Sequence, residues 1–192
     1  IDHEMCVECG ACRAACPFGA IDERSSIVPV IMSIKTGSKV IAMVAPSIVG
    51  QFGLKVKADQ IYTALKMAGF ADVVEVAIGA DIVSVEEAEE YIETVPAKQP
   101  FMTSSCCPAF VNIVKKYVPD AADKVSHTVS PMVATGRWLK EQYPDATTVF
   151  IGPCIAKKGE AKGYPEYIDY VLTFEEAMCL MEGKDIKVEN VE

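Results

Sequence analysis

Short apolar runs alternate with amphipathic segments along most of this chain. The apolar runs have the length of β-strands and occupy residues 39–46, 72–78, 100–105 and 147–153. The amphipathic segments read as helices and occupy residues 57–70, 84–95, 108–118, 130–143 and 173–183. Buried strands that alternate with helices form mostly parallel sheets covered by helices on both faces. The pattern therefore predicts an α/β fold with a mostly parallel sheet flanked by helices.

Three residues with positional preferences mark the ends of these helices. Gly69 stops the first of them. Pro108 falls in the first turn of another, where a missing N–H costs least. Thr173 is predicted to cap the last helix.

The first 26 residues have a different texture, because they are short and dense in cysteine. They contain "CVECGACRAACPFGAI", which is too small to fold on an apolar core and needs a cross-link such as a bound metal or disulfides. We therefore predict two parts, a cysteine-rich segment over residues 1–26 and an α/β domain over residues 27–192.

Composition excludes several classes of protein. The chain has 192 residues, 51% of them hydrophobic, and a net charge of -9, which argues against a nucleic-acid partner. Its apolar stretches are too short to cross a bilayer, since "VIAMVAPSIVG" is interrupted by Pro46 and Gly50. Asp2, His3 and Glu4 stand where a signal peptide would need basic residues. These features predict a cytoplasmic protein without a membrane span.

Four of the eight cysteines have the spacing of iron–sulfur ligands. Cys6, Cys9, Cys12 and Cys16 follow the C-x2-C-x2-C-x3-C-P pattern of bacterial ferredoxins. A zinc site is the alternative, but zinc knuckles usually consist of two separated C-x2-C pairs. In ferredoxins the fourth cysteine serves a second cluster, so we expect residues 1–26 to be an incomplete 4Fe-4S segment whose other half lies upstream of Ile1.

Three further cysteines fall at the expected strand ends. Cys106 and Cys107 follow one strand and Cys154 follows another, where ligands bind in parallel sheets. Neighbouring side chains on an extended strand point to opposite sides, so Cys106 and Cys107 are expected to do two different jobs. The alternative is that both are small buried hydrophobes, as free cysteines often are.

The segments "TSSCCPAF" and "IGPCIAKKGE" resemble the first two signature motifs of the FeFe-hydrogenase family. "MVAPSI" and "GADIVSVEEAEE" extend the resemblance, so that it covers essentially the whole chain in order. It implies that residues 27–192 are the N-terminal part of an H-cluster domain. The implied H-cluster is a 4Fe-4S cubane joined through a cysteine to a diiron unit that carries CO, cyanide and a dithiolate amine.

The resemblance also implies roles for single positions. Cys107 and Cys154 match ligands of the cubane, and Cys106 matches the thiol that passes protons to the diiron amine. Lys157 matches a lysine that donates a hydrogen bond to a diiron cyanide, which suits a cation beside an anionic ligand. The positions that match the turn supporting the diiron ligands are Ala45, Pro46 and Ser47.

Three more positions match the family's proton relay from that thiol toward solvent, namely Glu87, Ser130 and Glu90. The two glutamates are three residues apart on an expected helix and share one face. The alternative interpretation of this acidic run is a solvated helix face.

The implied activity is the reversible reduction of protons to H2. The N-terminal cluster would receive electrons from a ferredoxin or from a flavin subunit that oxidises NADH. A thiol suits the last proton step because its pKa lies near neutrality.

The chain departs from the family pattern at several points. Ala109-Phe110 replaces Gly-Trp, and Gly152 replaces a methionine that packs on the diiron unit. The third, glycine-rich motif with two more cysteines does not follow Cys154, so we expect a fragment, or a second polypeptide that supplies those ligands.

The remaining candidates are weaker. We expect Cys179 to lie in the core, His3 on the surface and His127 at a helix start. The rival functions are a non-catalytic iron–sulfur protein, acting as an electron carrier, sensor or assembly factor, and a zinc-binding interaction module.

Overall fold

The computed structural model describes residues 1–191. Its centre is a sheet of four parallel strands in the order β2-β1-β3-β4. The strands are β1 (Val40–Val44), β2 (Asp72–Glu75), β3 (Thr147–Gly152) and β4 (Tyr170–Thr173). The prediction of an α/β fold with a parallel sheet is confirmed.

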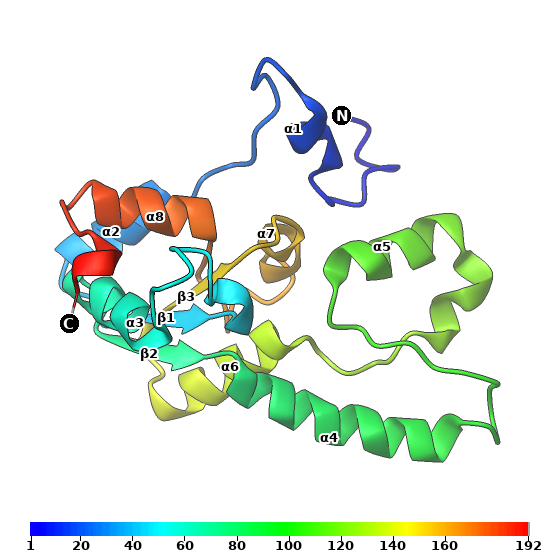
Figure 1. The fold of residues 1–192 in the computed structure, drawn as a ribbon. Coiled ribbons are helices and arrows are strands. Elements are labelled where there is room, and N and C mark those ends of the chain that lie inside the picture. Colours follow the sequence, from blue (N-terminus) through cyan, green and yellow to red (C-terminus); the bar gives the residue numbers. More distant parts are fainter. Residues whose placement is uncertain (192) are drawn as a thin grey trace.

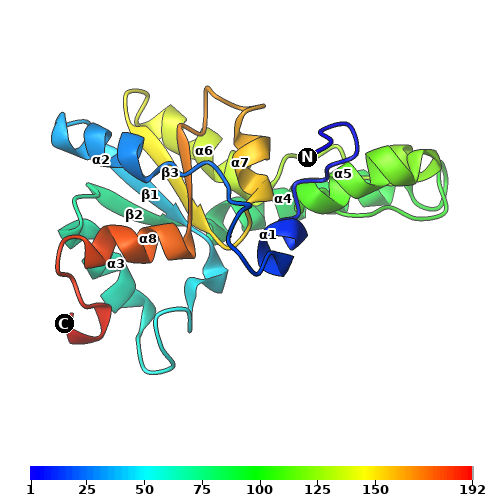
Figure 2. The same ribbon diagram turned by 90° about the horizontal axis from the view of Figure 1, so that it is seen from above.

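Helices cover both faces of this sheet (Figures 1 and 2). One face carries α2 (Ile27–Lys35), α3 (Ala58–Met67) and α8 (Phe174–Glu182), which are short amphipathic helices. The other face carries α6 (Pro131–Gln142), against which the long helix α4 (Ala77–Thr94) packs. The short helix α7 (Ala156–Ala161) follows β3 and contacts β4.

The core lies where the central strands are buried between these layers. All five residues of β1 are buried, and so are the last five of β3. Thr148 is the polar exception in β3, and its hydroxyl donates to the Tyr167 carbonyl oxygen at 2.6 Å. Buried polar groups need such partners, so a threonine is tolerated there.

The helix ends agree with the residues that mark them. Thr173 caps α8, because its side chain accepts from the Glu176 N–H at 3.2 Å while Glu176 accepts from the Thr173 N–H at 2.7 Å. Pro108 is the first residue of α5 (Pro108–Tyr117). Both assignments from sequence are confirmed.

Two parts of the molecule stand apart from the sheet (Figure 1). Helix α5 and the 3-10 turn Pro119–Lys124 form one end of the molecule beyond α4. The cysteine-rich segment, with the short helix α1 (Ala11–Ala15), lies over α7 and contacts α5. Two more 3-10 turns, Pro46–Ile48 and Val188–Asn190, complete the fold.

One expected strand is absent from the described residues. Residues 100–105 form no strand, and only Thr103 pairs, in an isolated bridge with Val125. Side-chain hydrogen bonds hold this segment in place of strand pairing, since the Ser105 hydroxyl donates to the Thr128 carbonyl oxygen. Cys106 and Cys107 therefore follow an irregular segment, and the prediction that they follow a strand was wrong.

Candidate functional site

The carboxyl ends of β1 and β3 form the topological switch point of the sheet. The chain leaves β1 toward β2 on one side and leaves β3 toward β4 on the other. At this point the Ala45 N–H donates to the Ile151 carbonyl oxygen at 2.9 Å. The turn Pro46–Ile48 and Cys154 follow directly. In open parallel sheets ligands bind in such a crevice, so these residues stand at the expected place.

Cys106 and Cys107 are both exposed, which contradicts the alternative that they are small buried hydrophobes. Cys107 is the residue immediately before α5. The N-terminal end of a helix dipole favours a negatively charged group. Cys154 is partly buried and precedes α7 in the same way, one residue farther from the helix.

Lys157, on the helix that follows Cys154, contacts the segment that carries Cys106. Its ammonium donates to the Cys106 carbonyl oxygen at 3.0 Å and to Glu160 Oε2 at 2.6 Å. The Lys157 side chain is only 11% exposed and the Glu160 side chain 13%. A buried cation needs such a counter-ion, and Glu160 provides it for Lys157.

Glu87 lies on the other side of the Cys106 segment. Its Oε1 accepts from the Ser104 hydroxyl at 2.9 Å and from the Ser105 N–H at 3.2 Å. The Ser104 hydroxyl also accepts from the Cys106 N–H at 3.4 Å. Thus the thiol segment is held between a carboxylate from α4 and an ammonium from α7.

Glu90 lies one turn farther along α4 and binds a second loop. It accepts from the Ser126 hydroxyl at 2.6 Å and from the His127 N–H at 3.1 Å, and it pairs with His127 Nδ1 at 2.7 Å. Burial alone would raise the pKa of Glu90, but the hydrogen bonds from Ser126 and His127 outweigh it and lower the pKa. Glu86 and Glu89 are exposed, so the acidic run is a solvated face only in part.

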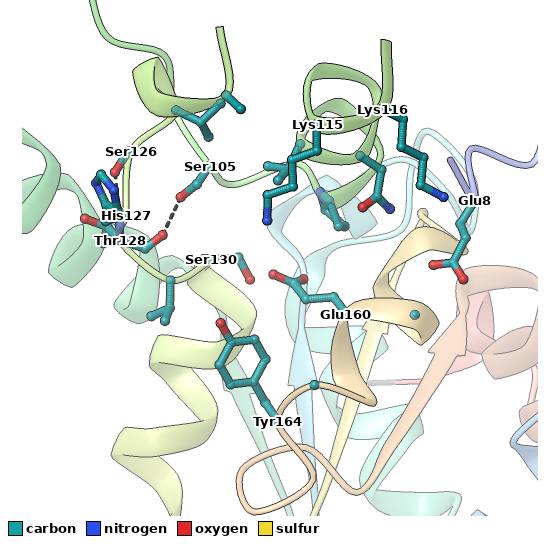
Figure 3. Close-up of a pocket in the computed structure, with 18 of the residues that line it drawn as sticks. Glu8, Ser105, Lys115, Lys116, Ser126, His127, Thr128, Ser130, Glu160 and Tyr164 are labelled. Carbon is teal, nitrogen blue, oxygen red and sulfur yellow. Dashed lines mark hydrogen bonds between the residues drawn. The ribbon is translucent and has the colours of Figure 1, made fainter. Parts of the chain in front are cut away.

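Ser130 stands where α6 begins and is buried. Among the described residues its hydroxyl oxygen has no hydrogen-bond partner, so it forms no hydrogen bond with Glu87 or Glu90. It lines a cavity of about 740 Å³ that Lys115, Glu160 and Tyr164 also line. Figure 3 shows the Ser130 hydroxyl and the Glu160 carboxylate turned toward the middle of this cavity.

Cys12 lies within α1, and the other three cysteines of the N-terminal run, Cys6, Cys9 and Cys16, lie outside it on either side. Cys6 and Cys16 are partly buried, whereas Cys9 and Cys12 are exposed. Backbone N–H groups point at two of the sulfurs, from Glu8 to Cys6 Sγ and from Ala20 to Cys16 Sγ, both at 3.4 Å. The backbone N–H of Phe18 and then that of Ala20 lower the pKa of the Cys16 thiol.

In residues 1–191, no three histidine, cysteine, aspartate or glutamate side chains converge closely enough to hold a metal ion. The donor set still suits an iron–sulfur cluster, because N–H···S hydrogen bonds of this kind favour thiolate ligands.

The cysteine-rich segment touches α7 directly beside Cys154. Gly10 lies against the Ile155 side chain, and Gly159 lies against the Glu8 carboxylate so closely that a Cβ would collide with it. A side chain at position 159 would displace the exposed Glu8 carboxylate. These contacts place Glu8 and Gly10, which flank Cys9, beside Ile155 and α7, which follow Cys154.

Two minor interpretations were wrong. Cys179 is exposed on α8 and does not lie in the core. His127 lies in the loop before α6, where it pairs with Glu90.

Three functional partners were missed from the sequence, namely Ser104, Ser126 and Glu160. Glu160 had a local signal, since it follows Lys157 by three residues on one helix face. Ser104 and Ser126 had no local signal, because their partners, Glu87 and Glu90 respectively, are distant in the sequence.

Two family models match the chain. Residues 38–192 match the model described as "Iron only hydrogenase large subunit, C-terminal domain", and residues 1–22 match the "4Fe-4S binding domain" model. The first match covers well over half of the chain.

Named relatives agree with these models. The chain is 33% identical to Iron hydrogenase 1 of Clostridium pasteurianum over 90% of this chain and 34% of that protein. It is 29% identical to the NADP-reducing hydrogenase subunit HndD of Solidesulfovibrio fructosivorans, over 95% of this chain and 36% of that subunit. It is 33% identical to the periplasmic [Fe] hydrogenase large subunit of Nitratidesulfovibrio vulgaris, over 83% of this chain and 50% of the relative. The chain thus spans a third to a half of these relatives.

A solved structure shares the fold. It is an [FeFe]-hydrogenase studied for oxygen inactivation of its H cluster, and it matches with a TM-score of 0.72 at 24% identity. The match covers 88% of this chain and 50% of that chain. In the described residues, no helix is both long enough and apolar enough to cross a membrane.

Proposed function

Because this chain belongs to the iron-only hydrogenase large-subunit family, we propose that it takes part in the reversible reduction of protons to H2 at an H-cluster. The observation that carries the proposal is the position of the Cys106 segment. Glu87 binds it from one side and Lys157 from the other. A carboxylate and a fixed cation thus flank the segment that carries the Cys106 thiol.

The residues present suit the iron groups that this activity needs. Cys6, Cys9 and Cys12 would hold a ferredoxin-type 4Fe-4S cluster, and Cys16 would serve the second cluster of a pair. Cys107 and Cys154 would hold the cubane of the H-cluster, and the turn with Ala45, Pro46 and Ser47 would line its diiron side. When bound, the H-cluster supplies the iron chemistry that combines two protons and two electrons into H2.

Lys157 would place a positive charge toward the diiron side. It is buried and paired with Glu160, and its ammonium already reaches the Cys106 carbonyl oxygen. A fixed, poorly solvated cation binds an anionic ligand such as cyanide more strongly than a solvated one would. Glu160 is a positioning residue in this arrangement, because it acts through Lys157.

Protons would reach the Cys106 thiol through side chains on α4 and the neighbouring loops. Glu87 and the Ser104 hydroxyl stand beside the thiol segment, and Glu90 with Ser126 stands one turn farther along α4. The expected relay residue Ser130 makes no such contact among the described residues. The contacts therefore favour Ser126 as the serine of the relay, while Ser130 remains a prediction.

Electrons would enter through the N-terminal segment from a partner protein, either a ferredoxin or a flavin subunit. One relative, HndD, is by its name a subunit of a larger hydrogenase, which supports a partner of this kind. The remaining H-cluster ligands would come from chain that these relatives have and the present 192 residues lack, or from a second polypeptide. We propose a cytoplasmic location. Because one relative is named periplasmic, cell fractionation is the experiment that checks it.

Substitution of the two neighbouring cysteines tests this proposal. In the full gene product, Cys106→Ala should lower H2 evolution from reduced methyl viologen by about 10²–10⁴-fold, the usual contribution of a positioned proton donor. Iron content and the electron paramagnetic resonance signals should stay unchanged. Cys107→Ala should instead lose iron from the cubane.

Two results would count against the proposal. Iron loss in Cys106→Ala would exchange the roles of the two thiols. A full gene product that binds 4Fe-4S clusters but never evolves H2 would favour the non-catalytic alternative.

A further inference from the structure

Helix α5 holds the loop of the first cysteine through backbone carbonyl groups. The Lys116 ammonium donates to the His3 carbonyl oxygen at 3.0 Å and to the Cys6 carbonyl oxygen at 2.7 Å. The Tyr117 hydroxyl donates to the Met5 carbonyl oxygen at 2.7 Å. Both side chains stand at the last turn of α5, so the loop is docked on the helix end opposite to Cys107.

This docking places a positive charge beside a proposed cluster ligand. The Lys116 ammonium is one hydrogen bond away from the backbone of Cys6. Figure 3 shows Lys116 reaching toward the N-terminal segment, whereas the adjacent Lys115 turns into the cavity. One of the acidic residues of the same loop, Glu8, lies against Gly159 of α7. Lys116 is thus the cation directed at this loop from α5.

We propose that Lys116 raises the reduction potential of the iron–sulfur cluster held by the N-terminal cysteines. The proposal rests on the ferredoxin-type cluster of the proposed function and adds the residue that tunes it. Reduction adds one negative charge to a cluster, and a nearby positive charge stabilises the reduced form. The two hydrogen bonds keep this charge at a fixed place, which an unbound surface lysine would not do.

The two contributions of Lys116, its charge and its docking bonds, can be separated by substitution. Lys116→Met removes the charge and the bonds while keeping much of the length of the side chain. Lys116→Arg keeps the charge and a donor. Tyr117→Phe removes a docking bond to the same loop without changing any charge. Lys115→Met removes the neighbouring charge, which points elsewhere.

The measurement is a redox titration of the anaerobically reconstituted chain with dithionite, followed by electron paramagnetic resonance of the cluster. We expect a more negative midpoint potential in Lys116→Met and a nearly unchanged one in Lys116→Arg and Tyr117→Phe. Lys115→Met should give a clearly smaller shift. Because Lys116 is exposed, its effect should shrink as ionic strength rises.

Hydrogen exchange of residues 1–9 reports the docking independently of the cluster. Lys116→Met and Tyr117→Phe should both accelerate exchange there, and Lys116→Arg should not. An equal shift of potential in Lys116→Met and Tyr117→Phe would show that docking, not charge, sets the potential, and it would overturn the proposal. An unchanged potential in Lys116→Met would overturn it as well.

Failure of the proposed function gives a different result. If the unsubstituted chain assembles no 4Fe-4S cluster on its N-terminal cysteines, the iron–sulfur part of the proposed function is wrong and the inference is overturned with it. If that cluster forms and only the substitutions leave its potential unchanged, the inference alone is wrong.

Discussion

Lys157 and Glu160 form an ion pair that is almost wholly withdrawn from solvent. Removal of one member leaves the other charged and unpaired in a buried place, which usually costs about 3–5 kcal/mol. Removal of both leaves no such charge. The pair should therefore show strong coupling in a double-mutant cycle.

We expect Lys157→Met and Glu160→Gln each to lower the free energy of unfolding by about 3 kcal/mol, and the double variant to lose clearly less than their sum. Urea denaturation of the four proteins measures the coupling. The exposed pair of Lys66 and Asp72, joined at 2.9 Å, is the matched control and should couple by about 0.2–1 kcal/mol. Additive losses at Lys157 and Glu160 would mean that water screens the pair.

Glu90 makes stability depend on pH with a definite sign. Its pKa is lowered below the ordinary value of 4.5, because hydrogen bonds from Ser126 and His127 outweigh the opposing effect of burial. A carboxyl group with a depressed folded-state pKa stabilises the protein above its unfolded pKa, and this contribution is lost as pH falls through the folded-state pKa.

Glu90→Gln should therefore destabilise the protein at pH 7, by about 1–2 kcal/mol from the lost charged hydrogen bonds. The difference from the unsubstituted protein should disappear as pH falls below 4.5 toward the lowered pKa. Urea denaturation at a series of pH values measures both effects. Glu89→Gln, on the exposed side of the same helix, should change neither.

The roles of these side chains could be predicted only where the sequence places the partners close together. Lys157 and Glu160 are three residues apart on one helix, so their pairing is a local property. Glu90 and its partner Ser126 are 36 residues apart in the sequence, so their contact depends on how α4 and α6 pack. The resemblance in sequence indicated Ser130 for the relay, whereas the serine hydrogen-bonded to Glu90 is Ser126.

Helices α4 and α6 approach each other unusually closely at Gly79. A Cβ on Gly79 would collide with the Pro131 carbonyl oxygen and the Thr135 hydroxyl, so only glycine fits between the two helices. This contact places the start of α6 beside α4. The distance between the carboxylates of α4 and the loop before α6 depends on it.

Gly79→Ala should therefore push the helices apart and destabilise the protein by about 1–3 kcal/mol, although alanine is the better helix former. The reverse sign is expected at a solvent-facing position of the same helix, so Ser84→Ala serves as the control. Urea denaturation of both variants decides between crowding and helix propensity. A stabilised Gly79→Ala would show that the helices have room to shift.

The sequence predicted those elements whose signals are local. Thr173 caps α8 as expected, because a capping box involves only residues three apart. Residues 100–105 were expected to be a strand from their apolar start, but the serines of this segment bind Glu87 and Thr128 instead of a neighbouring strand. Short elements such as β4 and α7 carry too few residues for a clear periodic signal.

The cysteine-rich segment is joined to the α/β domain by a second set of contacts, centred on Lys158 and Glu176. Lys158 Nζ lies 2.8 Å from Glu176 Oε2 and donates to the Arg24 carbonyl oxygen at 3.1 Å. The two side chains are 13% and 9% exposed. Arg13 adds an ion pair with Glu175 of α8 at 3.0 Å, in which Glu175 is largely solvated and Arg13 partly so.

Lys157 and Lys158 are neighbours on α7 and point to different parts of the molecule. One binds the carbonyl oxygen of Cys106 at the site, and the other holds the end of the cysteine-rich segment. The position of α7 therefore depends on both contacts. This arrangement ties the segment that would receive electrons to the helix that follows Cys154.

Lys158→Met should release the segment more than it perturbs the sheet. Burial alone would raise the pKa of Glu176, but hydrogen bonds, first of all from Lys158, outweigh it and lower the pKa. The contact is therefore stabilising above the ordinary pKa of 4.5 and is lost as pH falls through the lowered value.

Hydrogen exchange should show faster exchange of residues 1–26 in Lys158→Met at pH 7, with β1 and β3 still protected. Arg13→Met should have a much smaller effect, because exposed ion pairs contribute about 0–1 kcal/mol. Equal exchange in both variants would mean that the buried pair does not hold the segment, and that the contacts with α5 alone fix it.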